Sequence, residues 1–292
     1  MGLDIAATVL RATARSVGKA GHAVSTFYRE SIVHTTERGV GGLLAADAPS
    51  HPGMNPVGAG APAPTFLGSS TANQFLAQIY GNQFHTDNSW RAMFSAEHLA
   101  GLPQPLHDRV AAHMRTSPHG GIWLGEDSVV DIGHPAWPKG NVANQQPRGW
   151  PKGTTWRDVG GVYLPDHRAM LIGHTQRSDH LTGRHEFGHA VDAALGYPSQ
   201  EMKFKAVHQA VLGHFSGMNS EALKYMAQPG GVGQSELFAQ AFAWYDYVHK
   251  TQGQGILLPP TTPALTFLRS PAAAQHLIAY FDHLYTVLRI QP

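Results

Sequence analysis

The sequence predicts an α+β protein that is mostly helical and contains a small mixed sheet. Its 292 residues are 42% hydrophobic, which is enough to supply a proper core for one large domain or two small ones. Apolar residues recur at helical spacing in several segments, whereas others are rich in β-branched and aromatic residues. We expect an edge strand of the sheet to flank the helix that contains residues 185–189.

The predicted sheet is formed by residues 121–132 and by a hairpin at 161–173. A helix over 105–116 leads into the first of these segments. The hairpin has turn residues at its centre, Pro165–Arg168, between two short apolar runs. We expect the second run, Ala169–Ile172, to be an edge strand to which an extended peptide can pair.

Three helices are predicted after the hairpin. The first begins at Ser178 or Asp179, either of which can cap its N-terminus, and Gly196 ends it. The other two cover 234–250, after the glycine-rich break QPGGVGQS, and 271–290.

The N-terminal part of the chain differs in composition from the rest. Residues 1–47 have apolar residues at helical spacing, which predicts a helical segment that packs, frays or docks a partner. Residues 48–70 form a linker rich in Gly, Pro and Ala with little to bury. We therefore expect one folded domain over 71–292.

Composition excludes several classes of function. Only 14% of residues are charged and the net charge is +1, so there is no basic surface for nucleic acid or an anionic membrane. No window reaches the roughly 18 apolar residues of a membrane span, and the run Ile5–Leu10 is too short for a signal-peptide core. Cysteine is absent, so any metal site must use His, Asp or Glu.

The sequence HEFGH at residues 185–189 is the strongest functional signal. With 19 His and 8 Glu in the chain, an HExxH arises by chance about 3% of the time, so the pentapeptide alone does not decide. On a helix, His185 and His189 are one turn apart on one face and could bind one ion at about 2.0 to 2.1 Å. Glu186 lies at the neighbouring edge, where it could take a proton from a metal-activated water.

A hydrolytic zinc typically has a third protein ligand. Asp192 lies on the same face, but about 10 Å of helix axis separates it from His185, which is too far for a shared ion. Asp192 could instead orient His189 by accepting a hydrogen bond, or be a solvated helix residue. Glu236 is the better ligand candidate because its helix could return over the HExxH face; otherwise it is a first-turn Glu favoured by the helix dipole.

The segments HEFGHAVD and SELFAQAFA resemble the catalytic domain of anthrax lethal factor and its relatives, which include the Pro-Pro endopeptidases. These relatives are zinc metalloendopeptidases of the gluzincin type. The resemblance extends thinly from about Gly120 to the C-terminus and covers nothing before the linker. It implies that residues 71–292 form a zincin-like metallopeptidase domain.

The resemblance also implies roles for the matching residues. His185, His189 and Glu236 would be the zinc ligands, and Glu186 would be the general base. Four positions after the ligand Glu, where these relatives have an acidic residue, this chain has Gln240. Its amide could still accept a hydrogen bond from a ligand histidine, but would raise the basicity of that histidine less.

The relatives also have a tyrosine, shortly before the ligand Glu, that stabilises the tetrahedral intermediate. The tyrosine in that window here is Tyr225, eleven residues before Glu236 and separated from it by the insertion QPGGVG. The resemblance gives Tyr225 this oxyanion role, with His208 and His214 as substitutes. Alternatively, Tyr225 is a buried or edge tyrosine.

These observations predict a zinc endopeptidase that hydrolyses a peptide or protein substrate. One alternative keeps the zinc but acts on peptidoglycan stem peptides, with the Trp-containing loop 134–158 against the sugar. Another is a non-catalytic module that binds a partner. The resemblance favours a bacterial secreted effector or toxin, translocated without a Sec-type signal peptide and with a secretion-machinery or immunity partner; a cytoplasmic housekeeping peptidase is the other interpretation.

Overall fold

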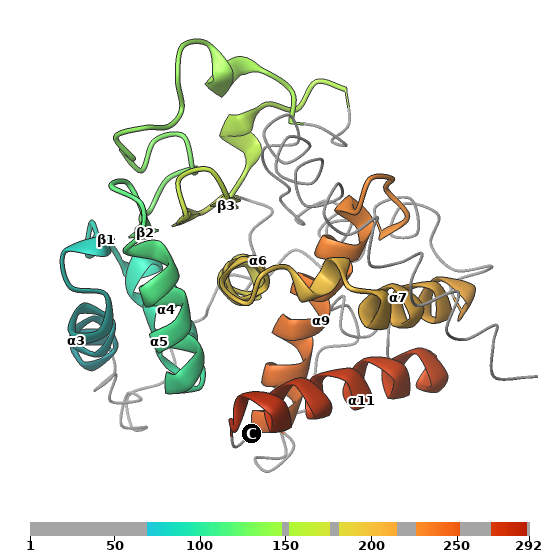
Figure 1. Ribbon diagram of the computed structural model, residues 1–292. Coiled ribbons are helices and arrows are strands. Elements are labelled where there is room, and N and C mark those ends of the chain that lie inside the picture. The colour runs from blue at the N-terminus through green and yellow to red at the C-terminus, as the bar shows by residue number, and fades with distance from the viewer. Residues whose placement is uncertain (1–68, 148–151, 176–180, 215–225, 252–269, 291–292) are drawn as a thin grey trace, which may run out of the picture.

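The computed structural model describes residues 69–147, 152–175, 181–214, 226–251 and 270–290. Within these ranges the protein is α+β, with seven α-helices and one mixed four-stranded sheet (Figure 1), which confirms the predicted class. The predicted N-terminal helical segment, 1–47, and the linker up to residue 68 lie outside the described residues. No helix in the described part of the chain is long and apolar enough to cross a lipid bilayer.

The first half of the described chain alternates helices with two short strands. Its elements are α3 (Ser69–Tyr80), β1 (Phe84–Thr86), α4 (Trp90–Ala100), α5 (Gln104–Met114) and β2 (Gly121–Leu124). The helix predicted over 105–116 is α5. The strand predicted over 121–132 is shorter than expected, because the chain turns after Leu124 and residues such as Val129 pack into a core instead of a sheet.

The second half contains the predicted hairpin and four helices. Its elements are β3 (Gly161–Leu164), β4 (Ala169–Ile172), α6 (Thr182–Ala194), the 3-10 helix η4 (Pro198–Gln200), α7 (Met202–His214), α9 (Val232–Thr251) and α11 (Pro271–Leu288). The proposed caps Ser178 and Asp179 lie outside the described residues. Gly196 follows the end of α6 in the left-handed conformation, with a φ of +80°, as predicted for a terminating glycine.

The strand order of the sheet is β1-β2-β4-β3, with the first two pairings parallel and the hairpin pairing antiparallel. The prediction that Ala169–Ile172 is an edge strand is therefore wrong. Strand β4 lies inside the sheet because β2, a distant segment in sequence, pairs along the side that the hairpin leaves open. The edge next to α6 is β3, which contacts that helix.

Each face of the sheet packs against a separate core. Ile122, Tyr163 and Met170 face the helices and join the large core, whereas the alternate residues of the strands face a smaller core under the loop after β2. Trp137 and Trp156 pack edge to face in that smaller core and are 7% and 5% exposed. Neither is placed to contact a sugar, so the described part of the loop favours packing over the proposed peptidoglycan contact.

Helix α6 lies at the centre of the molecule. Figure 1 shows it end-on, between the sheet with α4 and α5 on one side and α7, α9 and α11 on the other. All residues from Thr182 to Ala193 are buried, although five of them are charged or histidine. Buried polar groups are costly unless they are partnered, so this helix requires partners from the surrounding elements.

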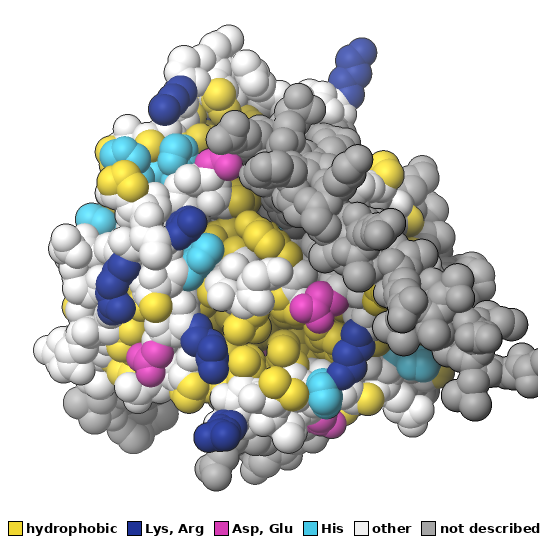
Figure 2. All heavy atoms as spheres, in the orientation of Figure 1, with side chains coloured by type: hydrophobic (Ala, Val, Ile, Leu, Met, Phe, Trp, Pro, Cys, Tyr) yellow, Lys and Arg dark blue, Asp and Glu magenta, His cyan; other side chains and the backbone are white. Residues whose placement is uncertain are grey.

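Several histidines outside α6 are held neutral by their surroundings. Figure 2 shows histidine side chains close together at the upper left of one face. Burial lowers the pKa of His85, His134 and His167, and burial with the nearby Arg168 lowers the pKa of His113 to about 4. Protonation of these rings is therefore easier in the unfolded chain.

Acidification should consequently destabilise the fold. Above about pH 6.5 these histidines are neutral in both states, but below it the unfolded chain takes up protons that the folded protein excludes, down to about pH 4 for His113. We therefore expect these histidines to lower the free energy of unfolding, measured in urea with a chelator present, as the pH falls from 7.5 to 5. The His113→Gln variant should lose less over this interval; an identical pH dependence of the two proteins would contradict the assignment.

Candidate metal centre

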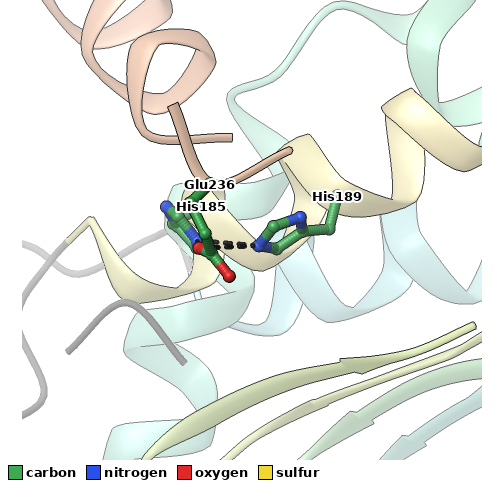
Figure 3. A group of neighbouring side chains, drawn as sticks. All are labelled: His185, His189 and Glu236. Carbon is green, nitrogen blue, oxygen red and sulfur yellow. Dashed lines mark hydrogen bonds and ion pairs between the residues drawn. The ribbon is translucent and has the colours of Figure 1, made fainter. Parts of the chain in front are cut away.

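Three side chains from two helices converge on one point inside the molecule. His185 and His189 come from α6 and Glu236 from the first turns of α9 (Figure 3). The two Nε2 atoms are 3.0 Å apart, and the Oε2 atom of Glu236 lies 3.5 Å from that of His185 and 3.4 Å from that of His189. This group, which is buried, could bind a metal ion and is the one such group among the described residues.

The spacing of the three atoms fits an ion of ordinary bond lengths. Three atoms separated by 3.0, 3.4 and 3.5 Å lie on a circle of radius about 1.9 Å, so an ion slightly out of their plane can be about 2.0 to 2.1 Å from each. To bind an ion, each atom must point a lone pair to the shared centre, which for both histidines requires the tautomer with the proton on Nδ1. The donor set and the geometry therefore fit a divalent cation.

A close crossing of α6 and α9 brings Glu236 to the histidines. A Cβ atom on Gly188 would lie 2.8 Å from the Cα atom of Ala239 and 3.0 Å from its carbonyl oxygen. Only glycine allows the two backbones to approach this closely. The rings of Phe187 and Phe242 stack beside the crossing, with centroids 6.1 Å apart. The glycine inside the HEFGH motif therefore has a packing role in addition to the polar roles of its neighbours.

The carboxylate of Glu186 lies between α6 and the edge strand of the sheet. A Cβ atom on Gly161, the first residue of β3, would lie 2.9 Å from Glu186 Cγ and 3.0 Å from its Oε1. Glu186 is fully buried and directly follows His185 in the sequence. The absence of a side chain at Gly161 thus makes the space that the Glu186 carboxylate occupies.

A buried ion pair joins α6 to its neighbours on another side. Arg184 Nη1 lies 3.0 Å from Asp246 Oδ2 of α9, and Arg184 Nε donates to the carbonyl oxygen of His98 at the end of α4. The Arg184 and Asp246 side chains are 7% and 2% exposed. The pair joins α6 to α9, and removing one partner would leave an unpaired buried charge.

Asp192 is buried and indirectly linked to a ligand histidine. Nδ1 of His189 lies 3.3 Å from the hydroxyl of Ser235, which in turn lies 3.5 Å from Asp192 Oδ2. Asp192 also accepts hydrogen bonds from the backbone N–H and the hydroxyl of Ser199 at 2.9 and 2.6 Å. Burial raises the pKa of its carboxyl to about 7, against the lowering effect of these hydrogen bonds.

Of the two interpretations of Asp192, the solvated helix residue is therefore wrong. Its connection to His189 passes through Ser235, which the sequence analysis did not single out. The sequence feature that could have indicated this role is the position of Ser235, one residue before Glu236. A residue that holds the second nitrogen of a ligand imidazole fixes the tautomer and the orientation of that ring.

Gln240 does not orient a ligand histidine in this structure. Its side chain is 2% exposed, and no hydrogen bond joins it to either imidazole among the described residues. Its Nε2 atom has no hydrogen-bond partner in the described part of the chain. On α9 it is Ser235, and not Gln240, whose side chain is within hydrogen-bonding distance of a ligand imidazole.

The two histidine candidates for oxyanion stabilisation do not join the three-residue group. Tyr225 lies outside the described residues, so its role stays a prediction. His208 is buried and its Nε2 donates to the carbonyl oxygen of Met226 at 2.7 Å, which ties α7 to the segment before α9. His214, at the exposed end of α7, stacks on His276 of α11. The described contacts of both histidines are with elements other than the metal centre.

Comparison with models of known protein families gives no match for this chain, and comparison with curated proteins gives none either.

The close crossing predicts a specific sensitivity at Gly188. In Gly188→Ala the added methyl meets the backbone of Ala239, so α6 and α9 must separate. We expect zinc affinity, measured by competition with a chelator, to fall by about 10-fold or more, and the free energy of unfolding to fall by about 1 to 3 kcal/mol.

Gly183→Ala is the matched control on the same helix. There the methyl meets the end of the Ile172 side chain at 3.2 Å, which can move, so zinc affinity should stay within about 2-fold of the wild type. Equal affinities for all three proteins would show that the crossing does not set the metal centre.

Proposed function

We propose that the protein is a zinc-dependent endopeptidase in which Glu186 is the general base. The observation that carries the proposal is that Glu236 of α9 converges with His185 and His189 of α6 to a spacing that fits one ion, and α6 also holds Glu186. Two imidazoles and one carboxylate are a ligand set of catalytic zinc sites in peptidases. Structural zinc sites, by contrast, are usually closed by a fourth protein ligand.

The donor atoms support zinc over the hard cations. Calcium and magnesium prefer oxygen ligands, whereas two of the three donors here are imidazole nitrogens. A zinc ion held by these residues would supply Lewis-acid activation of water and polarisation of a substrate carbonyl. The chain contains no cysteine that could provide a competing thiolate site.

In the proposed mechanism, Glu186 moves protons during hydrolysis. It follows the ligand His185 directly, and its carboxylate lies against Gly161 of β3. In the proposed reaction it takes a proton from the attacking water and delivers it to the nitrogen of the leaving amine. The pair of roles is possible for one carboxylate because the scissile carbonyl carbon and nitrogen are adjacent atoms.

Strand β3 is the proposed binding edge for the substrate. It is the edge strand that contacts α6, and its first residue touches Glu186. An extended peptide that pairs with β3 would add a strand to the sheet and bring its backbone alongside the general base. Main-chain pairing of this kind holds a peptide regardless of its sequence, which suits an endopeptidase.

The family assignment is part of the same proposal. The HEFGHAVD and SELFAQAFA segments support a zincin-like domain related to anthrax lethal factor, and on that resemblance we propose a bacterial effector or toxin protease. The oxyanion role of Tyr225 is proposed on the same basis.

The Glu186→Gln variant separates metal binding from proton transfer. Its amide is nearly the size of the carboxylate but cannot accept a proton, so the variant should retain one zinc per chain and lose turnover on a peptide library by about 100-fold or more. Zinc is quantified in both proteins in the same preparations.

Equal turnover of wild type and Glu186→Gln would show that Glu186 takes no part in the reaction and would contradict the proposed mechanism. A parallel assay on murein identifies the substrate class, since cleavage of murein without cleavage of peptides or casein would assign the activity to stem peptides instead.

Gly161→Ala tests the placement of Glu186 by the edge strand. The added methyl would lie 2.6 Å from Thr182 Cγ2 and 2.9 Å from Glu186 Cγ, which forces the carboxylate to move. We expect kcat to fall by about 100-fold while zinc content is unchanged, because a misplacement of about 1 Å has that effect on positioned groups. Gly213→Ala on α7, where a Cβ meets nothing within 4 Å, is the control and should keep wild-type turnover. Wild-type turnover of Gly161→Ala would contradict the placement.

A further inference from the structure

The short 3-10 helix η4 lies between the end of α6 and the beginning of α9. Gly196 turns the chain after α6, and Tyr197 N–H then donates to the Asp192 carbonyl oxygen at 2.7 Å. This return places Ser199 beside the Asp192 side chain, where it donates two hydrogen bonds. One end of η4 is thereby fixed to α6.

The other end of η4 is fixed to α9 by Gln200. Its Nε2 donates to the Ser199 hydroxyl at 3.0 Å and to the carbonyl oxygen of Gly231 at 2.9 Å. The same Gly231 carbonyl accepts the backbone N–H of Ser235 at 3.1 Å, so it is the acceptor that begins α9. Gln200 thus binds the first turn of the helix that presents Glu236.

The Gln200 side chain lies close against the backbone of Gly231. Gly231 has a φ of +89°, and a Cβ atom there would lie 2.3 Å from Gln200 Oε1. The side-chain amide packs directly on the backbone of the turn. Loss of this contact would release the first turn of α9 from η4.

Beside the metal centre, the described hydrogen bonds join His189 to a closed loop. From His189 the path runs through Ser235, Asp192, Ser199 and Gln200 to Gly231, and returns to Ser235 through the first bond of α9. One candidate ligand, His189, is attached to the loop through Ser235, which is also the residue before Glu236. Since the two ligands come from different helices, their 3.4 Å separation depends on how these helices are held together.

We propose that Gln200, acting with Ser199, is a positioning residue for the metal centre, which holds the first turn of α9 so that Glu236 and His189 keep the spacing needed for one ion. The inference rests on the proposed zinc site of the preceding section. It assigns to η4 a role in metal affinity that neither the HExxH motif nor the Glu236 segment contains. Gln200 touches neither the ion nor the substrate, and acts through the backbone of α9.

Two substitutions at Gln200 test this role. Gln200→Ala removes the hydrogen bonds and the packing, whereas Gln200→Met keeps most of the volume and removes the hydrogen bonds alone, so it serves if the alanine variant folds poorly. We expect the apparent Kd for zinc, from chelator competition, to rise by about 10-fold in both. The visible spectrum of the Co²⁺-loaded protein should also change, because the ligand geometry relaxes.

Gln83→Ala is the matched control. Gln83, on the 3-10 helix before β1 (Gly81–Gln83), also donates from its side-chain amide to a backbone carbonyl, that of Met114 at 3.0 Å, but it connects elements other than α6 and α9. It should reduce stability about as much as Gln200→Ala and leave both the zinc Kd and the Co²⁺ spectrum unchanged. An unchanged zinc Kd in the Gln200 variants, or an equal rise in Gln83→Ala, would overturn the proposal.

The experiments distinguish failure of this positioning role from failure of the proposed function. A wild-type protein that binds zinc, loses affinity on substitution of Gln200 and cleaves no peptide would retain the positioning role and lose the peptidase. A protein that cleaves peptides in a Glu186-dependent manner with unaltered zinc affinity in the Gln200 variants would do the reverse.

Discussion

The contact between Gly188 and Ala239 is the constraint on which the metal centre depends. It allows the backbones of α6 and α9 to meet, and the ligand Glu236 lies one turn of α9 before the point of contact. The histidines lie on the same part of α6, since His189 is the next residue after Gly188. A larger residue at the crossing would hold the Glu236 carboxylate away from both imidazoles, even if the sequence around each ligand stayed the same.

The polar character of α6 follows from the same arrangement. A central helix surrounded by the sheet and by other helices would normally be apolar, yet this one buries Arg184, His185, Glu186, His189 and Asp192. Arg184 pairs with Asp246, and Asp192 with Ser199, so α6 is held to its surroundings on both sides of the histidines. These two partnerships hold the helix in place on either side of His185, Glu186 and His189.

Part of this arrangement could be predicted from the sequence, because it follows from local patterns. Apolar periodicity or turn residues identify three elements in the sequence. These are the helix that contains HEFGH, the separate helix that begins near Glu236, and the hairpin that precedes both. The edge strand was assigned wrongly, since only the pairing of β4 with the distant β2 makes β3 the edge. The interaction of Gly161 with Glu186 likewise joins segments whose relative positions no local pattern encodes.

The connections around the ligands were missed for the same reason. Ser235 and Gln200 are ordinary polar residues in the sequence, and their importance depends on the fold that brings Asp192 and Gly231 beside them. Gln240, which the resemblance made prominent, forms no hydrogen bond with the imidazoles among the described residues. Spacing along one helix was therefore enough to identify the two histidines as candidate ligands. The residues around them could be identified only from the packing of three elements.

Crystallographic anomalous scattering at the zinc absorption edge, on protein loaded with one equivalent of zinc, tests the central claim most directly. The account predicts a single strong peak about 2.0 to 2.2 Å from Nε2 of His185, Nε2 of His189 and a carboxylate oxygen of Glu236. A peak bound by other residues, or one at the histidines with the Glu236 carboxylate beyond coordinating distance, would contradict it.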